Sequence, residues 1–269
     1  MVELGAAALA PFTRFSLYNS PYPAHDHGCA IDLYPPAGTT VAPSPVAGTV
    51  IETREVAAPT RAYAAATDHL IVVETATHTA RMLHVDPTVS VGETIAVGDP
   101  VGTLVTSGYA APWVPDHVHL GFRDPEADPV RARGSVPVSV DVSVTPVPWD
   151  GAGTVVDVGD TYATLDAPVP TAGFGGVAAN GGVLDGGLPH YAGGGLLDGA
   201  DGPVTVVGTT VGTATDRDVA WADVTVTVDG AAIRGLALSV GRDDRGVKLV
   251  APDHELAVGD VVEVALSVA

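Results

Sequence analysis

Histidine and aspartate side chains that can bind a metal or move a proton gather in the first half of this 269-residue chain. Imidazole and carboxylate groups are common zinc ligands, and imidazole also works as a general acid or base near neutral pH. The single cysteine, Cys29, excludes an intramolecular disulfide and any multi-cysteine zinc site. A metal centre therefore has to use histidine and acidic residues, and the informative candidates are His27, Asp32, His84, His117 and His119.

The segment Asp116–Phe122, with sequence DHVHLGF, alternates as a β-strand does. Residues two apart in a strand point to the same face, so His117 and His119 should project in one direction. One imidazole can then bind a metal while the other stands beside the reacting water. Alone, this His-x-His pattern is a weak signal, because paired histidines also occur as ordinary polar surface residues of a strand.

Two further segments add groups of the same kind. In HGCAID, Gly28 directly follows His27 and allows a flexible approach of the His27 and Asp32 side chains. In RMLHVD, an apolar strand ends at His84. Each signal is weak in isolation, since histidines at such positions often only pack in the core or make structural hydrogen bonds.

The elements that must position these residues are short strands. Val, Thr and Gly dominate, helix signals are scarce, and turn residues recur every few positions, which predicts an all-β protein. The predicted strands are Gly48–Thr53, Leu70–Thr75, Thr79–His84, His117–Arg123, Val138–Val144, Pro203–Val211, Val219–Val228, Ala232–Val240 and Val261–Val268.

The character of the chain changes near Asp124–Ser135, which places a boundary between residues 1–133 and 134–269. Seven of the nine histidines lie before it. The second half should form a small β-sandwich of unknown role. Within it, residues 173–202 hold 12 of the 32 glycines, and since glycine loses much backbone entropy on ordering, this segment is expected to be a long irregular loop.

Two segments of the first half, Ala37–Val50 and Val89–Leu104, resemble each other because glycine and proline recur at short intervals in both. Gly92 and Gly98 suit tight turns, because glycine adopts positive φ at little cost. The pattern is similar to the folded hammerheads of barrel-sandwich hybrid domains, a likeness of fold that does not assign a function.

In their order along the chain, these motifs resemble the lysostaphin/LytM-type zinc endopeptidases, which have a duplicated hybrid motif fold. The likeness runs over about Pro21–Arg123: a His…Asp pair, PVAGTV, LH, VSVGE…VGDPVG and HVHLGF. It implies zinc as the cofactor, and as the substrate a peptide or peptide-containing polymer. His27, Asp32 and His119 match the family's metal ligands, and His84 and His117 match its catalytic histidines.

One departure concerns spacing. The family has four residues from the first ligand to the aspartate, whereas His27 and Asp32 are five apart. An odd separation in a regular strand puts side chains on opposite faces. A bulge at Gly28–Cys29 would restore the pair; otherwise His25 is the ligand, or the site is lost. The segment Ser107–Asp116, with Tyr109 and Trp113, is also bulkier than the family's usual turn.

Other functions stay open. A catalytically inactive or repurposed LytM-like protein that binds a metal or a partner fits the altered spacing. A biotinyl or lipoyl carrier would need an acceptor lysine on a hairpin, and the only lysine is Lys248. A phosphocarrier-like domain would use two histidines without calling for Asp32 and His119.

The net charge indicates the salt conditions in which the protein works and says little about a reaction. With 32 acidic and 12 basic residues the net charge is -20, a composition that resembles halophilic proteins, especially those of haloarchaea. An acidic chain with one lysine is not expected to bind nucleic acid. No signal peptide or membrane span is recognised, so we expect a cytoplasmic protein, with export by an unrecognised route as the alternative.

Overall fold

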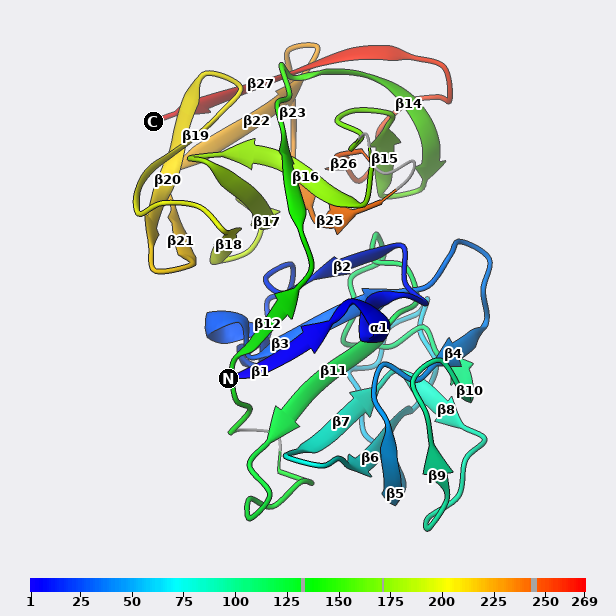
Figure 1. The fold of residues 1–269 in the computed structure, drawn as a ribbon. Coiled ribbons are helices and arrows are strands. Elements are labelled where there is room, and N and C mark those ends of the chain that lie inside the picture. Colours follow the sequence, from blue (N-terminus) through cyan, green and yellow to red (C-terminus); the bar gives the residue numbers. More distant parts are fainter. Residues whose placement is uncertain (132–133, 171, 243–245) are drawn as a thin grey trace. The chain divides into compact units, whose positions relative to one another are not determined.

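The computed structural model describes residues 1–131, 134–170, 172–242 and 246–269, and it is an all-β protein as predicted. The chain forms two compact units. The first comprises residues 1–15 and 22–142, and the second comprises residues 16–21 and 143–269 (Figure 1). The boundary predicted after residue 133 falls next to residues 132–133, which lie outside the described part.

The first unit holds one helix, α1 Ala6–Leu9, one 3-10 turn, η1 Pro23–Gly28, and short strands. Its strands are β1 Val2–Gly5, β3 Ala30–Tyr34, β4 Val41–Pro43, β5 Gly48–Val56, β6 Asp68–Glu74, β7 Thr79–Leu83, β8 Val85–Pro87, β9 Thr94–Ile95, β10 Pro100–Leu104, β11 Val118–Arg123 and β12 Val138–Asp141. Strand β2, Arg14–Ser16, spans the first division between the units.

An antiparallel sheet in the order β9-β5-β6-β7-β11-β3 is the frame of the first unit (Figure 1). Strands β6 and β11 are buried along nearly their whole length, and apolar side chains such as those of Leu70–Val73 supply this part of the core. A second small sheet has the order β4-β10-β8, and β1 pairs in parallel with β12. The turns expected at Gly92 and Gly98 are confirmed by φ values of 90° and 88°.

The second unit is built from hairpins. Its strands are β13 Val144–Val147, β14 Ala152–Gly159, β15 Tyr162–Leu165, β16 Phe174–Ala179, β17 Gly182–Leu188, β18 Gly193–Leu197, β19 Gly202–Val206, β20 Thr209–Thr215, β21 Asp218–Trp221, β22 Val224–Val228, β23 Ala231–Ile233, β24 Gly235–Leu238, β25 Val240–Gly241, β26 Lys248–Val250 and β27 Val261–Val268. Several segments predicted as one strand, such as Pro203–Val211, are thus two strands joined by a turn.

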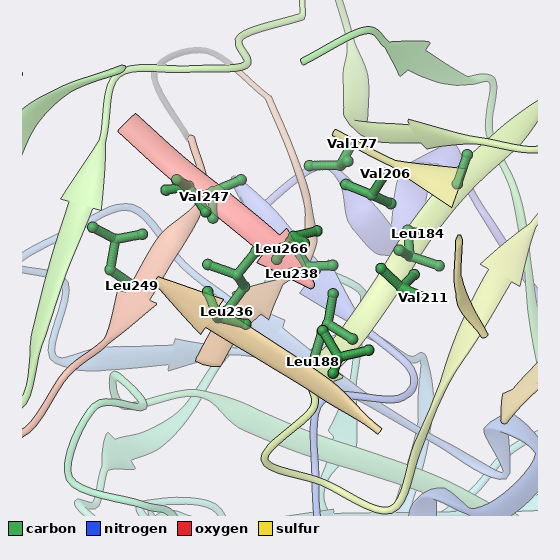
Figure 2. Close-up of a cluster of buried hydrophobic side chains, with 14 of the residues drawn as sticks. Val177, Leu184, Leu188, Val206, Val211, Leu236, Leu238, Val247, Leu249 and Leu266 are labelled. Atoms are coloured by element: carbon green, nitrogen blue, oxygen red, sulfur yellow. The ribbon is translucent and has the colours of Figure 1, made fainter. Parts of the chain in front are cut away.

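Leucine and valine side chains from many of these strands pack into one core (Figure 2). Strand β27 shows how the sequence supplies it, because its residues alternate between buried and exposed over most of its length. The labelled residues of Figure 2 come from β16, β17, β19, β20, β24, β26 and β27 and the segment before β26, so the core joins strands far apart in sequence.

The irregular loop predicted over residues 173–202 is wrong, because the structure forms β16, β17 and β18 there. Some of the glycines allow close packing against aromatic rings. A Cβ added at Gly195 would lie 2.1 Å from the Tyr18 ring, and one at Gly194 would lie 2.2 Å from the Trp221 ring. A high glycine content suggests a flexible segment, whereas here the absence of a Cβ lets neighbouring groups pack closely against the strands.

Within the described residues, no helix is long and apolar enough to cross a membrane. Lys248, the lysine weighed as a carrier attachment point, is buried in β26 with its Nζ 4.0 Å from the centre of the Tyr162 ring. This position in a sheet interior does not match an acceptor lysine presented on an exposed hairpin.

Candidate metal centre

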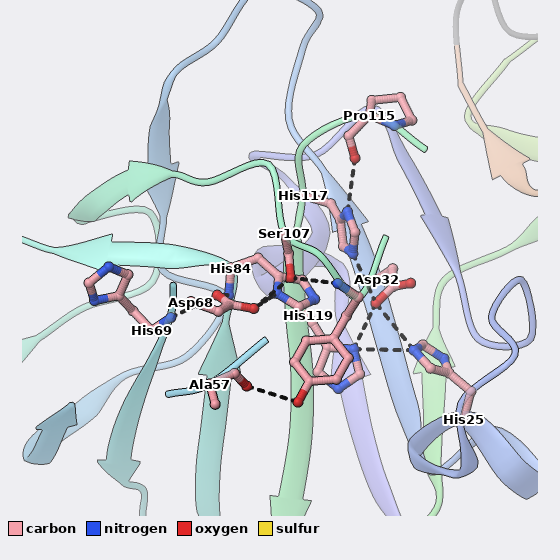
Figure 3. A network of polar contacts seen from close by, with 11 residues as sticks. His25, Asp32, Ala57, Asp68, His69, His84, Ser107, Pro115, His117 and His119 are labelled. Atoms are coloured by element: carbon pink, nitrogen blue, oxygen red, sulfur yellow. Dashed lines mark hydrogen bonds and ion pairs between the residues drawn. The ribbon is translucent and has the colours of Figure 1, made fainter. Parts of the chain in front are cut away.

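Two neighbouring strands bring Asp32 and His119 together (Figure 3). Strands β3 and β11 are antiparallel, and Asp32 lies directly opposite His119 in their register. Side chains of directly opposed residues share one face of a sheet. His119 Nδ1 lies 2.9 Å from Asp32 Oδ1, so two of the expected ligands meet through sheet pairing.

The third group beside them is His25, from η1. His25 Nε2 lies 3.3 Å from Asp32 Oδ1 and 3.2 Å from His119 Nδ1. One ligand atom from each of the three residues lies within 4.8 Å of the others, so the group could hold a metal ion. His25 and Asp32 are buried, and only 12% of the His119 side chain is exposed.

His27, the ligand expected from sequence, is exposed and is not part of this group. The reason is the local backbone: the chain leaves the helical conformation at Asp26, and His27 has a φ of 54°. This turn presents His25 inward before β3 begins at Ala30. Strand alternation therefore does not govern the spacing to Asp32, and the structure favours the alternative ligand, His25.

Both expected catalytic histidines lie beside the group. The ring of His84 is centred 5.0 Å from that of His117 and 5.6 Å from that of His119. His117 directly precedes β11, and its Nε2 lies 3.5 Å from Asp32 Oδ1. Its Nδ1 lies 2.9 Å from the carbonyl oxygen of Pro115. Four histidines and one aspartate thus converge from η1, β3, β11 and the end of β7.

Asp68 and Ser107 also belong to the site, although sequence reasoning missed them. Asp68 Oδ2 lies 2.6 Å from His84 Nδ1 and accepts a hydrogen bond of 2.6 Å from Ser107 Oγ (Figure 3). The one available signal was an acidic residue at the start of the apolar strand β6, where a carboxylate is costly unless it is paired.

Two family models match this chain over most of its length. The "Domain of unknown function (DUF8155) N-terminal domain" matches residues 3–140, and the corresponding C-terminal domain matches residues 145–267. The chain belongs to the DUF8155 family. Every residue of the site lies in the DUF8155 N-terminal domain.

Comparisons with curated proteins and solved structures add no activity for this DUF8155 protein. No curated protein matches its sequence. Among solved structures, "The antimicrobial peptidase lysostaphin from Staphylococcus simulans" aligns over 97% of this chain and 99% of that chain, at 15% identity and a TM-score of 0.27. A likeness at this level does not establish a shared activity.

The electrostatics of the DUF8155 site suit a cation. Burial alone would raise the pKa of Asp32, but His25, His117 and a hydrogen bond from His119 outweigh burial and hold this pKa well below its usual range. Burial lowers the pKa of His119 to about 4. At neutral pH the group therefore offers a carboxylate and a neutral imidazole, the forms that bind metals.

Aromatic side chains border the site. The Tyr109 ring is centred 6.4 Å from that of His84 and 5.3 Å from that of Tyr22, and its hydroxyl donates to the carbonyl of Ala57. Trp113 in the same segment is buried. The bulky segment noted in the sequence thus places Tyr109 beside a candidate catalytic histidine.

Proposed function

We propose that this DUF8155 protein is a zinc-dependent metallopeptidase that cleaves a peptide bond in a peptide or peptide-containing polymer. The observation that carries the proposal is the convergence of His25, Asp32 and His119, with two further histidines beside them. The family resemblance of the sequence motifs supports the same reaction.

The donor set fits zinc. Two imidazole nitrogens and one carboxylate oxygen form a ligand set of the kind zinc uses at catalytic sites, where three protein ligands leave one position open. His25 Nε2, Asp32 Oδ1 and His119 Nδ1 would hold the ion. Bound zinc would supply a Lewis acid that activates water and polarises the substrate carbonyl.

His84 and His117 would move the protons. Peptide hydrolysis needs one group that accepts a proton from water and one that stabilises the oxyanion or protonates the leaving amine. The Nδ1 atoms of both histidines face oxygen atoms, of Asp68 and Pro115 respectively. This leaves Nε2 of His84 for the reaction, and it directs Nε2 of His117 toward the metal-ligand group, 3.5 Å from Asp32 Oδ1.

The test combines hydrolysis of a peptide library with zinc analysis. We expect His84→Ala and His117→Ala each to lower kcat by about 10²–10⁴, the usual contribution of general acid–base catalysis. Zinc content should stay at the wild-type value in both variants. Activity that persists in both, or that is independent of zinc, would contradict the proposal.

A second candidate is a metal-binding domain that does not hydrolyse peptides. The aromatic rings near His84 favour it, because Tyr109 is centred 6.4 Å from the His84 ring and 5.3 Å from the Tyr22 ring, and such bulk restricts the space for a substrate. Zinc bound by the wild type with no cleavage in the library, and none after Tyr109→Ala, would favour this second function.

A further inference from the structure

Asp68 is a carboxylate enclosed by hydrogen-bond donors. It is the first residue of β6, and its side chain is fully buried. Oδ1 accepts hydrogen bonds from the backbone N–H groups of His69, at 2.7 Å, and His84, at 3.0 Å. Oδ2 lies 2.6 Å from both Ser107 Oγ and His84 Nδ1. Four contacts fill the acceptor capacity of one carboxylate.

These contacts leave Asp68 as an acceptor only. The two backbone N–H groups at Oδ1 can only donate. The Ser107 hydroxyl accepts a hydrogen bond of 3.1 Å from the Tyr109 N–H and is thus free to donate to Asp68. Burial alone would raise the pKa of Asp68, but the hydrogen bonds from His84 and Ser107 and the neighbouring imidazole lower it to about 2.

The backbone of His84 is held by the same carboxylate. His84 joins β7 to β8 with a φ of 68°, a left-handed conformation that is uncommon for residues other than glycine. The His84 N–H donates to Asp68, and its carbonyl accepts from the Val105 N–H at 2.9 Å. Strained backbone of this kind persists when its surroundings over-determine it.

We infer that Asp68, supported by Ser107, is a positioning residue that fixes His84 as the Nδ1–H tautomer and leaves the Nε2 lone pair for the reaction. Because the carboxylate only accepts, His84 Nδ1 has to carry the proton. A neutral imidazole protonated at Nδ1 has its lone pair at Nε2. The consequence for catalysis rests on the proposed metallopeptidase function, whereas the tautomer itself does not.

Asp68→Asn tests the inference with almost no change of shape. The amide oxygen should take the Oδ1 position, because two fixed backbone N–H groups face it. The amide nitrogen then faces His84 Nδ1 and donates to it, which moves the imidazole proton to Nε2. Ser107 can rotate its hydroxyl to accept from the same amide.

The decisive readout is the pair of imidazole ¹⁵N chemical shifts of His84 in long-range ¹H–¹⁵N spectra of the full-length protein, assigned with His84→Gln. We expect the Nδ1–H tautomer in the wild type and Nε2–H in Asp68→Asn. The control Asp86→Asn removes a carboxylate whose side chain is 62% exposed and lies 3.7 Å from His69 Nε2. It should keep the wild-type tautomer. A wild type with the Nε2–H tautomer overturns the inference even if Asp68→Asn does not fold.

Kinetics separate this inference from the proposed function. In a peptide assay Asp68→Asn should lower kcat by about 10²–10⁴, the range for a wrong tautomer or a lost general base, with KM and zinc content unchanged. Wild-type protein without peptidase activity would contradict the proposed function while the tautomer result stands. A folded Asp68→Asn with the Nδ1–H tautomer or full activity overturns the inference.

Discussion

At the scale of single residues, Asp32 is the centre of the site. Its Oδ1 lies 2.9 Å from His119 Nδ1, 3.3 Å from His25 Nε2 and 3.5 Å from His117 Nε2. One oxygen atom thus has three imidazole neighbours, and a buried carboxylate with cationic or hydrogen-bonding neighbours keeps its charge. Such a carboxylate can serve as a metal ligand beside His25 and His119, while His117 is left to transfer protons.

The buried His190 should make the stability of the folded protein sensitive to acid. Burial, and secondarily Arg234, lowers the pKa of His190 from 6.5 to about 4. The unfolded chain therefore binds a proton below pH 6.5, while the folded chain binds it only near pH 4. The free energy of unfolding should fall as the pH drops from about 6.5 to about 4, by at most about 1.4 kcal/mol per pH unit from this one group.

Chemical denaturation between pH 7 and 4 measures this slope. His190→Gln removes the titrating group and should flatten the pH dependence relative to the wild type. An identical slope in both proteins would show that His190 does not carry the effect.

At the scale of elements, sheet register positions the ligands, and one irregular turn completes the set. Strand alternation in the sequence was enough to predict that His117 and His119 share a face. It offered His25 only as an alternative ligand, because the 3-10 turn η1 has irregular backbone at Asp26 and His27 and no periodic signal in the sequence. Asp68 was missed for a related reason: its partners His84 and Ser107 are 16 and 39 residues away, and only tertiary packing brings them close.

The glycine-rich strands give an element-scale prediction. Gly195→Ala would place a Cβ 2.1 Å from the Tyr18 ring, so the strand or the ring has to shift. We expect a loss of about 1–3 kcal/mol in the free energy of unfolding, the usual cost of overpacking. Gly5→Ala is the control, because its added Cβ meets nothing within 4 Å. Equal stability of the two variants would contradict the packing role assigned to Gly195.

At the scale of the whole molecule, the net charge of -20 acts on stability. Like charges on a compact protein repel one another, and salt screens this repulsion, with a Debye length of about 10 Å at 0.1 M and about 3 Å at 1 M. The effect of this charge on stability follows from composition alone.

The all-β architecture was also predictable from the sequence, because valine, threonine and turn residues recur along the chain.

Because salt screens charge repulsion, we expect the thermal unfolding temperature to rise between 0.1 M and 2 M KCl. The matched control is the same titration with sucrose at equal osmolality, which stabilises by exclusion from the surface and does not screen charge. A rise no larger in KCl than in sucrose would show that charge repulsion is a minor factor.

The proposed function depends on a zinc site formed by His25, Asp32 and His119. The most direct measurement is a crystal structure grown with zinc, accompanied by metal analysis of His25→Ala and His27→Ala. We expect one ion at about 2.0–2.2 Å from His25 Nε2, Asp32 Oδ1 and His119 Nδ1, with zinc lost in His25→Ala and retained in His27→Ala. Zinc bound through His27, or no ion at these three atoms, would contradict it.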